Sequence, residues 1–572
     1  MSVSFNRAAK HQVRSAIAAA ASLMCLGLSA NTAQAARAPL APQVQLTDGI
    51  VEGVKLRGKH KDVRVFRGIP YAAPPIEDFR FREPQPVARW AGVRNARQFG
   101  PRCMQSPVAG KLDFRSTVMS EDCLYLNVWT GANGADQKLP VLVYFHGGAL
   151  VSGDGSEPRY DGANLASRGM VAVTVNYRLG AFGFLAPPGA ASESSHGTAG
   201  NYGLLDQVAA LRWVRENIAQ FGGDPSKVTI AGSAAGSVAV SAHMASPLSR
   251  DLFARAIGQS GAAFAPNGIW TREEAERAAR DFSARVGASS LQQLRALPAR
   301  TLLAATTQPL RSDKPVTFRP SIDGYFLTES PEQVFARGGQ AQVPLLLGSN
   351  AHEEAATAPA AGHRVVTLKD RLAKFRDQVD EALAHYPGNA NVGLSTHRWM
   401  DAHRQTGQAS VFYYRYAHEM PPKTTAPEAA AADAAAAATA GVVEPPVLGV
   451  FHDAQVPYSL GNLDGQRRYA WTAADYDVSR VFSRYIEQFV KTGDPNGGRA
   501  GSDGSSAGEP QARNAGSVPS WPAVRVDHQG TLLQLIGENT HSVWDQPASP
   551  QDVAQQQPAG ESNPEATAPV AR

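Results

Sequence analysis

The sequence lacks the short motifs that mark cofactor enzymes. Its 572 residues contain no glycine-rich dinucleotide fingerprint and no P-loop. No group of His, Cys, Asp and Glu has the spacing of a metal site. Internal repeats are also missing. We therefore expect neither a metal nor an organic cofactor.

An excess of charge of one sign is missing too. There are 55 Lys and Arg residues against 51 Asp and Glu residues, a formal net charge of +4. Three of the positive charges, Arg7, Lys10 and Arg14, lie at the N-terminus, so the remainder carries about +1. This balance gives no reason to expect a nucleic acid or an anionic membrane as partner.

A hydrophobic run long enough to cross a bilayer is not present either. The apolar run from Ser15 to about Ser29 is too short, and Ala33-Gln34-Ala35 follows it as an A-x-A cleavage site. We interpret residues 1–35 as a signal peptide, so the protein is expected to be secreted or periplasmic, with no membrane span after processing.

Cysteine is scarce. Cys25 lies in the signal, so only Cys103 and Cys123 would remain in an oxidising compartment, where we expect them to pair.

What is present is the composition of an ordinary globular protein, with 43% hydrophobic and 19% charged residues. Apolar runs at 124–130, 141–145, 171–176, 228–230, 344–348 and 410–415 predict strands. Helical spacing is found at 202–221, 272–286, 291–297, 368–385 and 478–491. Alternation of this kind predicts a largely parallel sheet with helices on both faces. Segments 424–441, 496–517 and 546–572 are expected to be flexible insertions and a disordered tail.

The stretch from Lys227 to Ser241 contains the most informative pattern. A short apolar strand is followed by Gly232-Ser-Ala-Ala-Gly236 and then by residues that can begin a helix. This is the frame of the nucleophile elbow of α/β-hydrolases, G-x-S-x-G, with Ala234 where the serine belongs. Ser233 or Ser237 could replace the nucleophile only by a shift that puts alanines where the turn needs glycines.

Several stretches together resemble the type-B carboxylesterase family. They are FRGIPY at 66–71, SEDCLYLNVW at 120–129, HGG at 146–148, NYRLG at 176–180, GNYGLLDQ at 200–207, FGGDP at 221–225 and QSG at 259–261. The resemblance covers about residues 45–545. It implies the α/β-hydrolase fold: one domain over 36–545, with a large, mostly parallel sheet flanked by helices and an active site at the carboxyl edge of its strands.

The resemblance also implies roles for individual residues. Glu353 matches the triad acid and His452 the triad base, with Ala234 in the nucleophile's place. Gly147, Gly148 and Ala235 match the oxyanion hole. Cys103 and Cys123 match a disulfide, and Arg80 and Glu121 a buried ion pair. The chain departs from the family at Ala234, at Glu354, where glycine is usual, and at Asp453, where a small residue is usual. Glu354 therefore remains an alternative to Glu353.

The implied activity is hydrolysis of a small-molecule ester through an acyl-enzyme, which needs a hydroxyl activated by an oriented base. Ala234 removes that hydroxyl, so the chain is expected to be inactive or strongly impaired. Two interpretations remain open: an esterase inactivated at residue 234, or a natural non-catalytic binding protein on the same scaffold. Direct activation of water by His452 and Glu353 is a third. The 103–123 loop has no tryptophan for a choline platform, and the sequence predicts no oligomeric state.

Overall fold

The structure is a computed structural model of the chain. It describes residues 42–105, 113–265, 268–307, 318–351, 353, 356–357, 392–423, 447–448, 450–497, 518–527 and 530–545. Contacts group Gln43–Arg572 into one compact unit. The expected signal peptide, the predicted helix at 368–385, the insertion at 424–441, nearly all of 496–517 and the tail lie outside the described residues.

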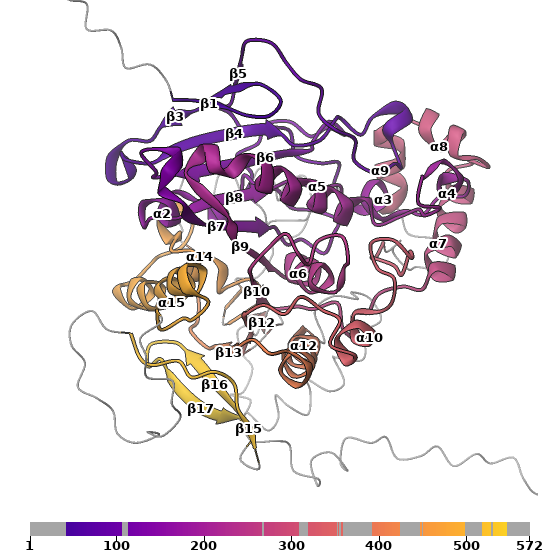
Figure 1. The fold of residues 1–572 in the computed structure, drawn as a ribbon. Helices are drawn as coiled ribbons and strands as arrows, with labels where there is room; N and C mark the ends of the chain where they lie inside the picture. The colour runs from indigo at the N-terminus through magenta and orange to yellow at the C-terminus, as the bar shows by residue number, and fades with distance from the viewer. Residues whose placement is uncertain are drawn as a thin grey trace, which may run out of the picture. The chain divides into compact units, whose positions relative to one another are not determined.

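A large mixed sheet forms the centre of this unit (Figure 1). Seven neighbouring strands are parallel, in the spatial order β8 (Val171–Val175), β7 (Leu139–Phe145), β9 (Gly223–Ser233), β10 (Arg255–Gln259), β11 (Leu345–Asn350), β13 (Val411–Tyr416) and β16 (Gly530–Ile536). Antiparallel strands complete the two edges: β6 (Tyr125–Thr130), β4 (Arg64–Pro70) and β3 (Val54–Lys55) at one, β15 (Val526–Asp527) and β17 (His541–Asp545) at the other. The predicted mostly parallel sheet is thus confirmed.

Two small sheets accompany the large one. One contains β1 (Gln43–Gln45), β2 (Ile50–Glu52) and β5 (Val93–Asn95), and the other pairs β12 (Ala356–Thr357) with β14 (Val447–Leu448). In the sequence, β12 follows Glu353 closely and β14 shortly precedes His452.

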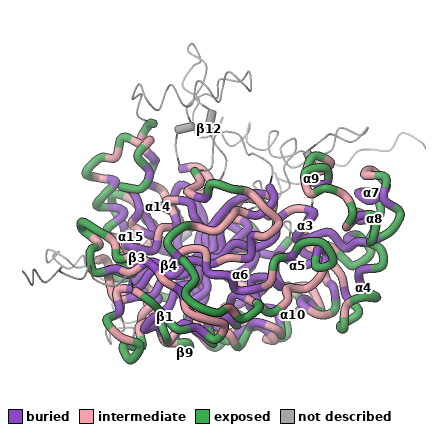
Figure 2. Tube along the Cα trace, turned by 90° about the horizontal axis from the view of Figure 1, so that it is seen from above, coloured by how far each residue is buried: buried purple, intermediate pink, exposed green. Residues whose placement is uncertain are grey.

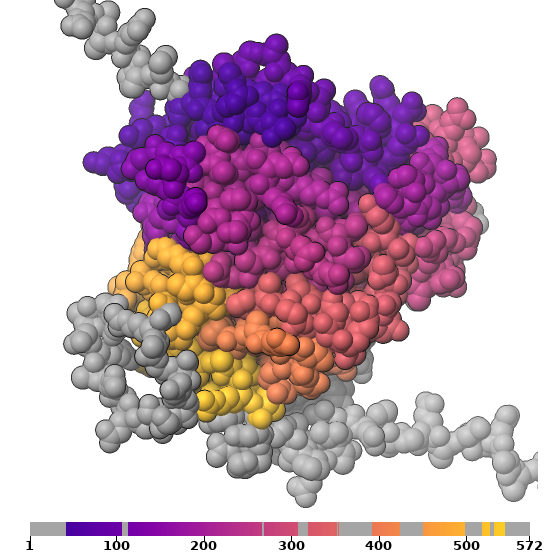
Figure 3. Space-filling view, in the orientation of Figure 1, coloured from indigo at the N-terminus to yellow at the C-terminus, as the bar shows by residue number. Residues whose placement is uncertain are grey.

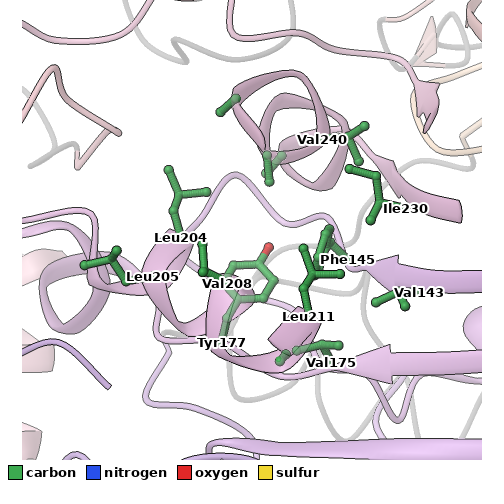
Figure 4. Packing of buried hydrophobic residues seen from close by; sticks show 14 of the residues in the cluster. Val143, Phe145, Val175, Tyr177, Leu204, Leu205, Val208, Leu211, Ile230 and Val240 are labelled. Atoms are coloured by element: carbon green, nitrogen blue, oxygen red, sulfur yellow. The ribbon is translucent and has the colours of Figure 1, made fainter. Parts of the chain in front are cut away.

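Alternation along β7 shows how the sheet divides the core. Val143 and Phe145 belong to one buried cluster and Leu142 and Tyr144 to the other, because successive side chains of a strand point to opposite faces. Figure 4 shows Val143 and Phe145 on the first face with Val175, Leu211 and Ile230. Strands β8 and β11 are buried along their whole length, and buried residues fill the middle of the tube in Figure 2. Both faces of the sheet are therefore covered.

Different helices cover the two faces. Helices α5 (Tyr202–Asn217), α6 (Ala235–Ala245) and α12 (Val392–Thr406) contribute to the first cluster. Helices α2 (Ala163–Ser167), α14 (Val456–Ser459) and α15 (Ala473–Thr492) contribute to the second. In Figure 3 the gold segment that carries α14 and α15 lies directly beside the magenta middle of the chain. The other α-helices in the described part of the chain are α3 (Gly180–Phe184), α4 (Ala190–Glu193), α7 (Arg272–Arg285), α8 (Leu291–Ala296), α9 (Ala299–Thr307) and α10 (Pro331–Ala336).

The predicted elements differ from the observed ones mainly at their ends. Strand β9 is longer than the predicted 228–230, and α6 begins at Ala235 instead of Ser237. The predicted helix 202–221 is α5 followed by a 3-10 turn, Ile218–Phe221. Helix α12 was not predicted. Within the described residues, no helix has both the length and the apolar character that a bilayer crossing requires.

The order of strands predicts where a ligand would bind. The chain passes from β7 to β8 on one side and then crosses to β9 on the other side of β7. In such sheets ligands bind outside the carboxyl ends of the strands where the direction of winding reverses. His146 follows β7 directly, and the turn at Ala234 follows β9.

Candidate active site

The strand-to-helix turn after β9 has the geometry of a nucleophile elbow at Ala234. This residue has φ 52° and ψ −118°, a backbone conformation that is unfavourable for a residue with a β-carbon. A β-carbon on Gly232 would lie 2.4 Å from the carbonyl carbon of Gly236, and one on Gly236 would lie 2.1 Å from the Phe145 oxygen. Ala234 is partly exposed, whereas Ser233 and Ala235 are buried. The turn therefore presents residue 234 to solvent, and that residue is alanine.

Neither neighbouring serine offers a substitute hydroxyl. Both side chains are fully buried. The Ser233 hydroxyl donates to Asp453 Oδ1, and the Ser237 hydroxyl donates to the Gly261 carbonyl. These contacts speak against a shifted register in which either serine would be the nucleophile.

His452 and Glu353 lie in direct contact. Nδ1 of His452 is 2.7 Å from Oε2 of Glu353, and the other carboxylate oxygen accepts the Asn350 N–H at 2.7 Å, where β11 ends. Glu353 is thus the carboxylate that orients the imidazole, while Glu354 lies outside the described residues. Nε2 of His452 has no hydrogen-bond partner among the described side chains, and the imidazole is 18% exposed.

The surroundings of His452 favour its protonated form. Burial alone would lower the pKa of the imidazole, but the charges of Asp453 and Glu353 outweigh burial and raise the pKa to about 8. Arg159 opposes them more weakly. The imidazole therefore binds a proton more tightly than a free histidine does.

Hydrogen bonds join the loop that carries His452 to the ends of the central strands. Ser233 and Asp453, the chain neighbours of Ala234 and His452, are bonded to each other. Gln455 donates to Ser260 at 3.1 Å and accepts from Asn350 at 2.8 Å. Three strand ends, those of β9, β10 and β11, thus hold this loop beside the elbow.

The predicted oxyanion donors need one correction. Gly147 lies beside the elbow, because a β-carbon there would be 3.3 Å from that of Ala234. However, Gly147 is buried and its N–H donates to Tyr160 Oη at 3.3 Å, so this N–H is already engaged. The N–H groups of Gly148, Ala149 and Ala235 have no partner among the described residues.

Ala149 is therefore a further candidate donor, which sequence reasoning missed. It is exposed and has φ 55°, and Gly148 before it has φ 109°. Its residue type carried no signal, because a backbone donor can come from any residue except proline. The Ala149 N–H is identified as a candidate donor only from the backbone conformation of the loop after β7, in which Gly148 and Ala149 have positive φ.

The predicted disulfide and ion pair are both present. The Cys103 and Cys123 sulfurs are 2.05 Å apart. Arg80 forms two bonds of 2.6 Å to Glu121, and both side chains are largely buried. Arg80 also donates to the Arg295 and Leu297 carbonyls where α8 ends, so this ion pair fixes the loop against that helix.

Metal ligands are not gathered at this site. Within the described ranges, no group of three or more His, Cys, Asp and Glu side chains could hold an ion.

Comparisons with known proteins agree with this geometry. The carboxylesterase family model matches residues 40–386 and 364–552. The para-nitrobenzyl esterase of Bacillus subtilis (strain 168) is 34% identical over 474 residues, which are 78% of this chain and 89% of that protein. The cocaine esterase of Homo sapiens is 30% identical over 84% of this chain and 85% of its own length. The fumonisin B1 esterase of Sphingopyxis macrogoltabida is 39% identical, but over only 60% of this chain and 63% of its own length.

Solved structures show the same likeness. A PNB esterase has a TM-score of 0.65 at 31% identity, covering 90% of this chain and 99% of its own. A carboxylesterase of Geobacillus stearothermophilus has a TM-score of 0.66 at 28% identity, covering 90% and 100%. The elbow, the His–Glu pair and these matches lead to one conclusion: the chain belongs to the carboxylesterase family and has the α/β-hydrolase fold.

Proposed function

We propose that the chain is a serine-type carboxylic ester hydrolase in which Ala234 stands in the nucleophile's place, so that it binds esters but hydrolyses them poorly. The observation that carries this proposal is the 2.7 Å contact between His452 and Glu353 beside an intact elbow. A base oriented by a carboxylate serves chemistry in which a hydroxyl loses its proton. The relatives are named as esterases, which supports a small-molecule ester as the substrate.

The proposed chemistry assigns each group one task. With serine at position 234, the hydroxyl oxygen would attack the acyl carbon while His452 Nε2 takes its proton and passes it to the leaving alcohol. Water would then release the acid from the enzyme by the same proton route. The N–H groups of Gly148, Ala149 and Ala235 would bind the carbonyl oxygen as it becomes negative, each contributing about 2.7–4 kcal/mol. With alanine, no acyl-enzyme can form at the apex of the turn.

The test is to restore the hydroxyl. Ala234→Ser should raise the hydrolysis rate of p-nitrophenyl acetate and butyrate by roughly 10³-fold to 10⁶-fold, since loss of a triad serine costs up to about 10⁶ in turnover. The double variant Ala234→Ser, His452→Ala is the matched control and should lose this gain. An Ala234→Ser protein that folds and shows no turnover would contradict the proposal.

A second function is favoured by Ala234 itself, which leaves a formed site without a nucleophile. In this alternative the chain is a natural binding protein for a ligand or a protein partner. It predicts that Ala234→Ser gains no esterase activity. Activation of water by His452 is the third interpretation, and it predicts that His452→Ala abolishes whatever slow hydrolysis the unaltered chain has.

We also propose that the protein is exported and works outside the cytoplasm. The basic, apolar and A-x-A segments of residues 1–35 support this, and so does the Cys103–Cys123 disulfide, which persists in oxidising compartments. Mass spectrometry of the protein from a periplasmic extract or culture medium should find Ala36 as the first residue. A cytoplasmic protein that keeps Met1 would contradict this.

A further inference from the structure

The residue after His452 is a carboxylate whose side chain is only 18% exposed. Asp453 has φ 68°, a left-handed backbone conformation that aspartate tolerates better than most residues with a β-carbon. Its Oδ1 accepts from Ser233, the residue before the apex of the elbow, and its Oδ2 accepts from Arg159 Nη1 at 3.1 Å. Asp453 thus links the loop carrying the base to the turn carrying residue 234.

Arg159 connects Asp453 to the segment that follows the oxyanion loop, which is the loop of residues 147–149 after β7. It lies in the 3-10 turn η4 (Pro158–Tyr160) and donates through Nε to Glu157 Oε2 at 2.8 Å. Tyr160 of the same turn accepts the Gly147 N–H. One carboxylate therefore joins three segments of the site: the elbow, the loop with His452, and the segment that follows Gly147 and Gly148.

The charges of this carboxylate and of its neighbours affect the pKa of the His452 imidazole. Among the described residues, the negative charges of Asp453 and Glu353 raise the pKa of the imidazole, and the positive charge of Arg159 lowers it. Arg159 and His452 both hold the pKa of Asp453 below its usual value, against a burial effect that would raise it. The phenols nearby, those of Tyr144, Tyr160 and Tyr414, have pKa values raised by burial and stay neutral. Asp453 is thus ionised at neutral pH and lies next to the base.

We propose that Asp453 is a positioning residue of the site: through Ser233 and Arg159 it fixes the loop of His452 against the elbow, and its charge stabilises the imidazolium. The effect of Asp453 on catalysis rests on the proposed function, whereas its effect on the pKa of His452 does not. It also explains why a partly buried carboxylate occupies a position where the family usually has a small residue.

The first experiment uses the chain as it exists, without any turnover. The pKa of His452 is measured by NMR titration of the protein with ¹⁵N-labelled histidine, and His452→Gln assigns the signal. Asp453→Asn should lower this pKa by about 1 or more, because a nearby opposite charge shifts a pKa by about 1–3 and the positive charge of Arg159 would lose one of its two carboxylate partners. Asp477→Asn, which removes an exposed carboxylate on α15, is the matched control and should leave the pKa unchanged.

A second variant separates position from charge. Ser233→Ala removes one contact of Asp453 and keeps its charge, so the pKa of His452 should stay the same. In the Ala234→Ser background, Ser233→Ala and Asp453→Asn should each lower kcat about 10-fold or more with little change in KM, because misplacement of a catalytic group reduces turnover. Only Asp453→Asn should also move the acidic limb of the kcat/KM profile to lower pH.

The outcomes distinguish this inference from the proposed function. A folded Asp453→Asn protein with an unchanged pKa of His452 would overturn the inference, even if its melting temperature fell. If Asp453→Asn does not fold, an unchanged kcat in the double variant Ala234→Ser, Ser233→Ala would overturn it. An inactive Ala234→Ser protein whose His452 still responds to Asp453→Asn would instead count against the proposed function alone.

Discussion

Glycine at position 236 is required by the close approach of two backbones. A β-carbon there would lie within 2.1 Å of the Phe145 carbonyl oxygen, so α6 could not stay against the end of β7. Alanine is a better helix former than glycine by about 1 kcal/mol, and the clash outweighs this gain. The glycines of the elbow are therefore set by packing as much as by the turn.

Gly236→Ala should lower the free energy of unfolding by about 2 kcal/mol or more, since overpacking costs about 1–3 kcal/mol and the obstructing atoms are backbone. Urea unfolding followed by circular dichroism measures the change. Gly268→Ala is the matched control, because its β-carbon would enter open space, and it should change stability by less than about 0.5 kcal/mol. Equal effects of the two substitutions would contradict the packing argument.

At this scale the sequence predicted residue positions better than contacts. The motif frame placed residue 234 at the apex of a turn, and the structure has it there. It could not predict the bond between Ser233 and Asp453, because a contact across 220 residues depends on the fold. For the same reason it gave Gly147 a donor role without seeing that Tyr160 Oη accepts that N–H.

Two helices begin with the same capping box but in different surroundings. In α7 the cap pairs Thr271 with Glu274, which is exposed, and in α15 it pairs Thr472 with Asp475, which is buried. Asp475 also accepts from His418 at 2.9 Å and from Tyr458 at 2.6 Å. The α15 cap is therefore linked through Asp475 to buried groups of the core, although Thr472 itself is exposed.

Asp475→Ala should cost about 3 kcal/mol or more of unfolding free energy, because it leaves two buried donors without their acceptor in addition to the lost cap. Glu274→Ala should cost about 1 kcal/mol or less, since the exposed groups regain water. Chemical denaturation of both variants in parallel gives the comparison. Similar losses would show that the buried bonds of Asp475 contribute little.

Elements with strong periodicity were predictable and others were not. The predicted 478–491 helix corresponds to α15, which begins five residues earlier, at the cap. Helix α12 was missed although Val392, Thr396, Trp399 and Met400 form a buried stripe, because small and polar residues interrupt its apolar pattern. Strand β9 was predicted too short because its first residues include Asp224 and Pro225, which are typical of turns.

Across the whole molecule, a buried histidine makes the fold sensitive to acid. His243 of α6 is fully buried, with Nε2 2.8 Å from Gln207 of α5 and Nδ1 2.9 Å from the Ser249 hydroxyl. Burial lowers the pKa of its imidazole to about 3. The folded chain thus keeps this histidine neutral, whereas the unfolded chain protonates it below about pH 6.5. Stability is lost as pH falls through that range.

His243→Gln should weaken this response. From pH 7 to pH 5 the unaltered chain should lose about 2 kcal/mol through this residue, and the variant should lose about that much less, even if it is less stable at pH 7. Denaturation at both pH values measures the difference. His541→Gln, at an exposed position, should leave the pH response unchanged. An unaltered response in His243→Gln would show that other groups set the acid sensitivity.

The fold class could be predicted from the sequence, but the arrangement of strands could not be read from it. Local periodicity indicates strands and helices, whereas the position of β9 between β7 and β10 follows from how the whole chain packs. That arrangement brings the elbow, the oxyanion loop and the His–Glu pair to one edge.

The position of β16 next to β13 in the sheet affects folding during synthesis. Strand β13 pairs with β11 on one side and with β16 on the other, and β16 begins more than a hundred residues after β13 ends. During synthesis β13 is thus left with open backbone donors and acceptors, which favour pairing between chains, until residues 530–536 have left the ribosome. A chaperone that binds the exposed edge of β13 would prevent this, and a product terminated before residue 530 would be expected to aggregate.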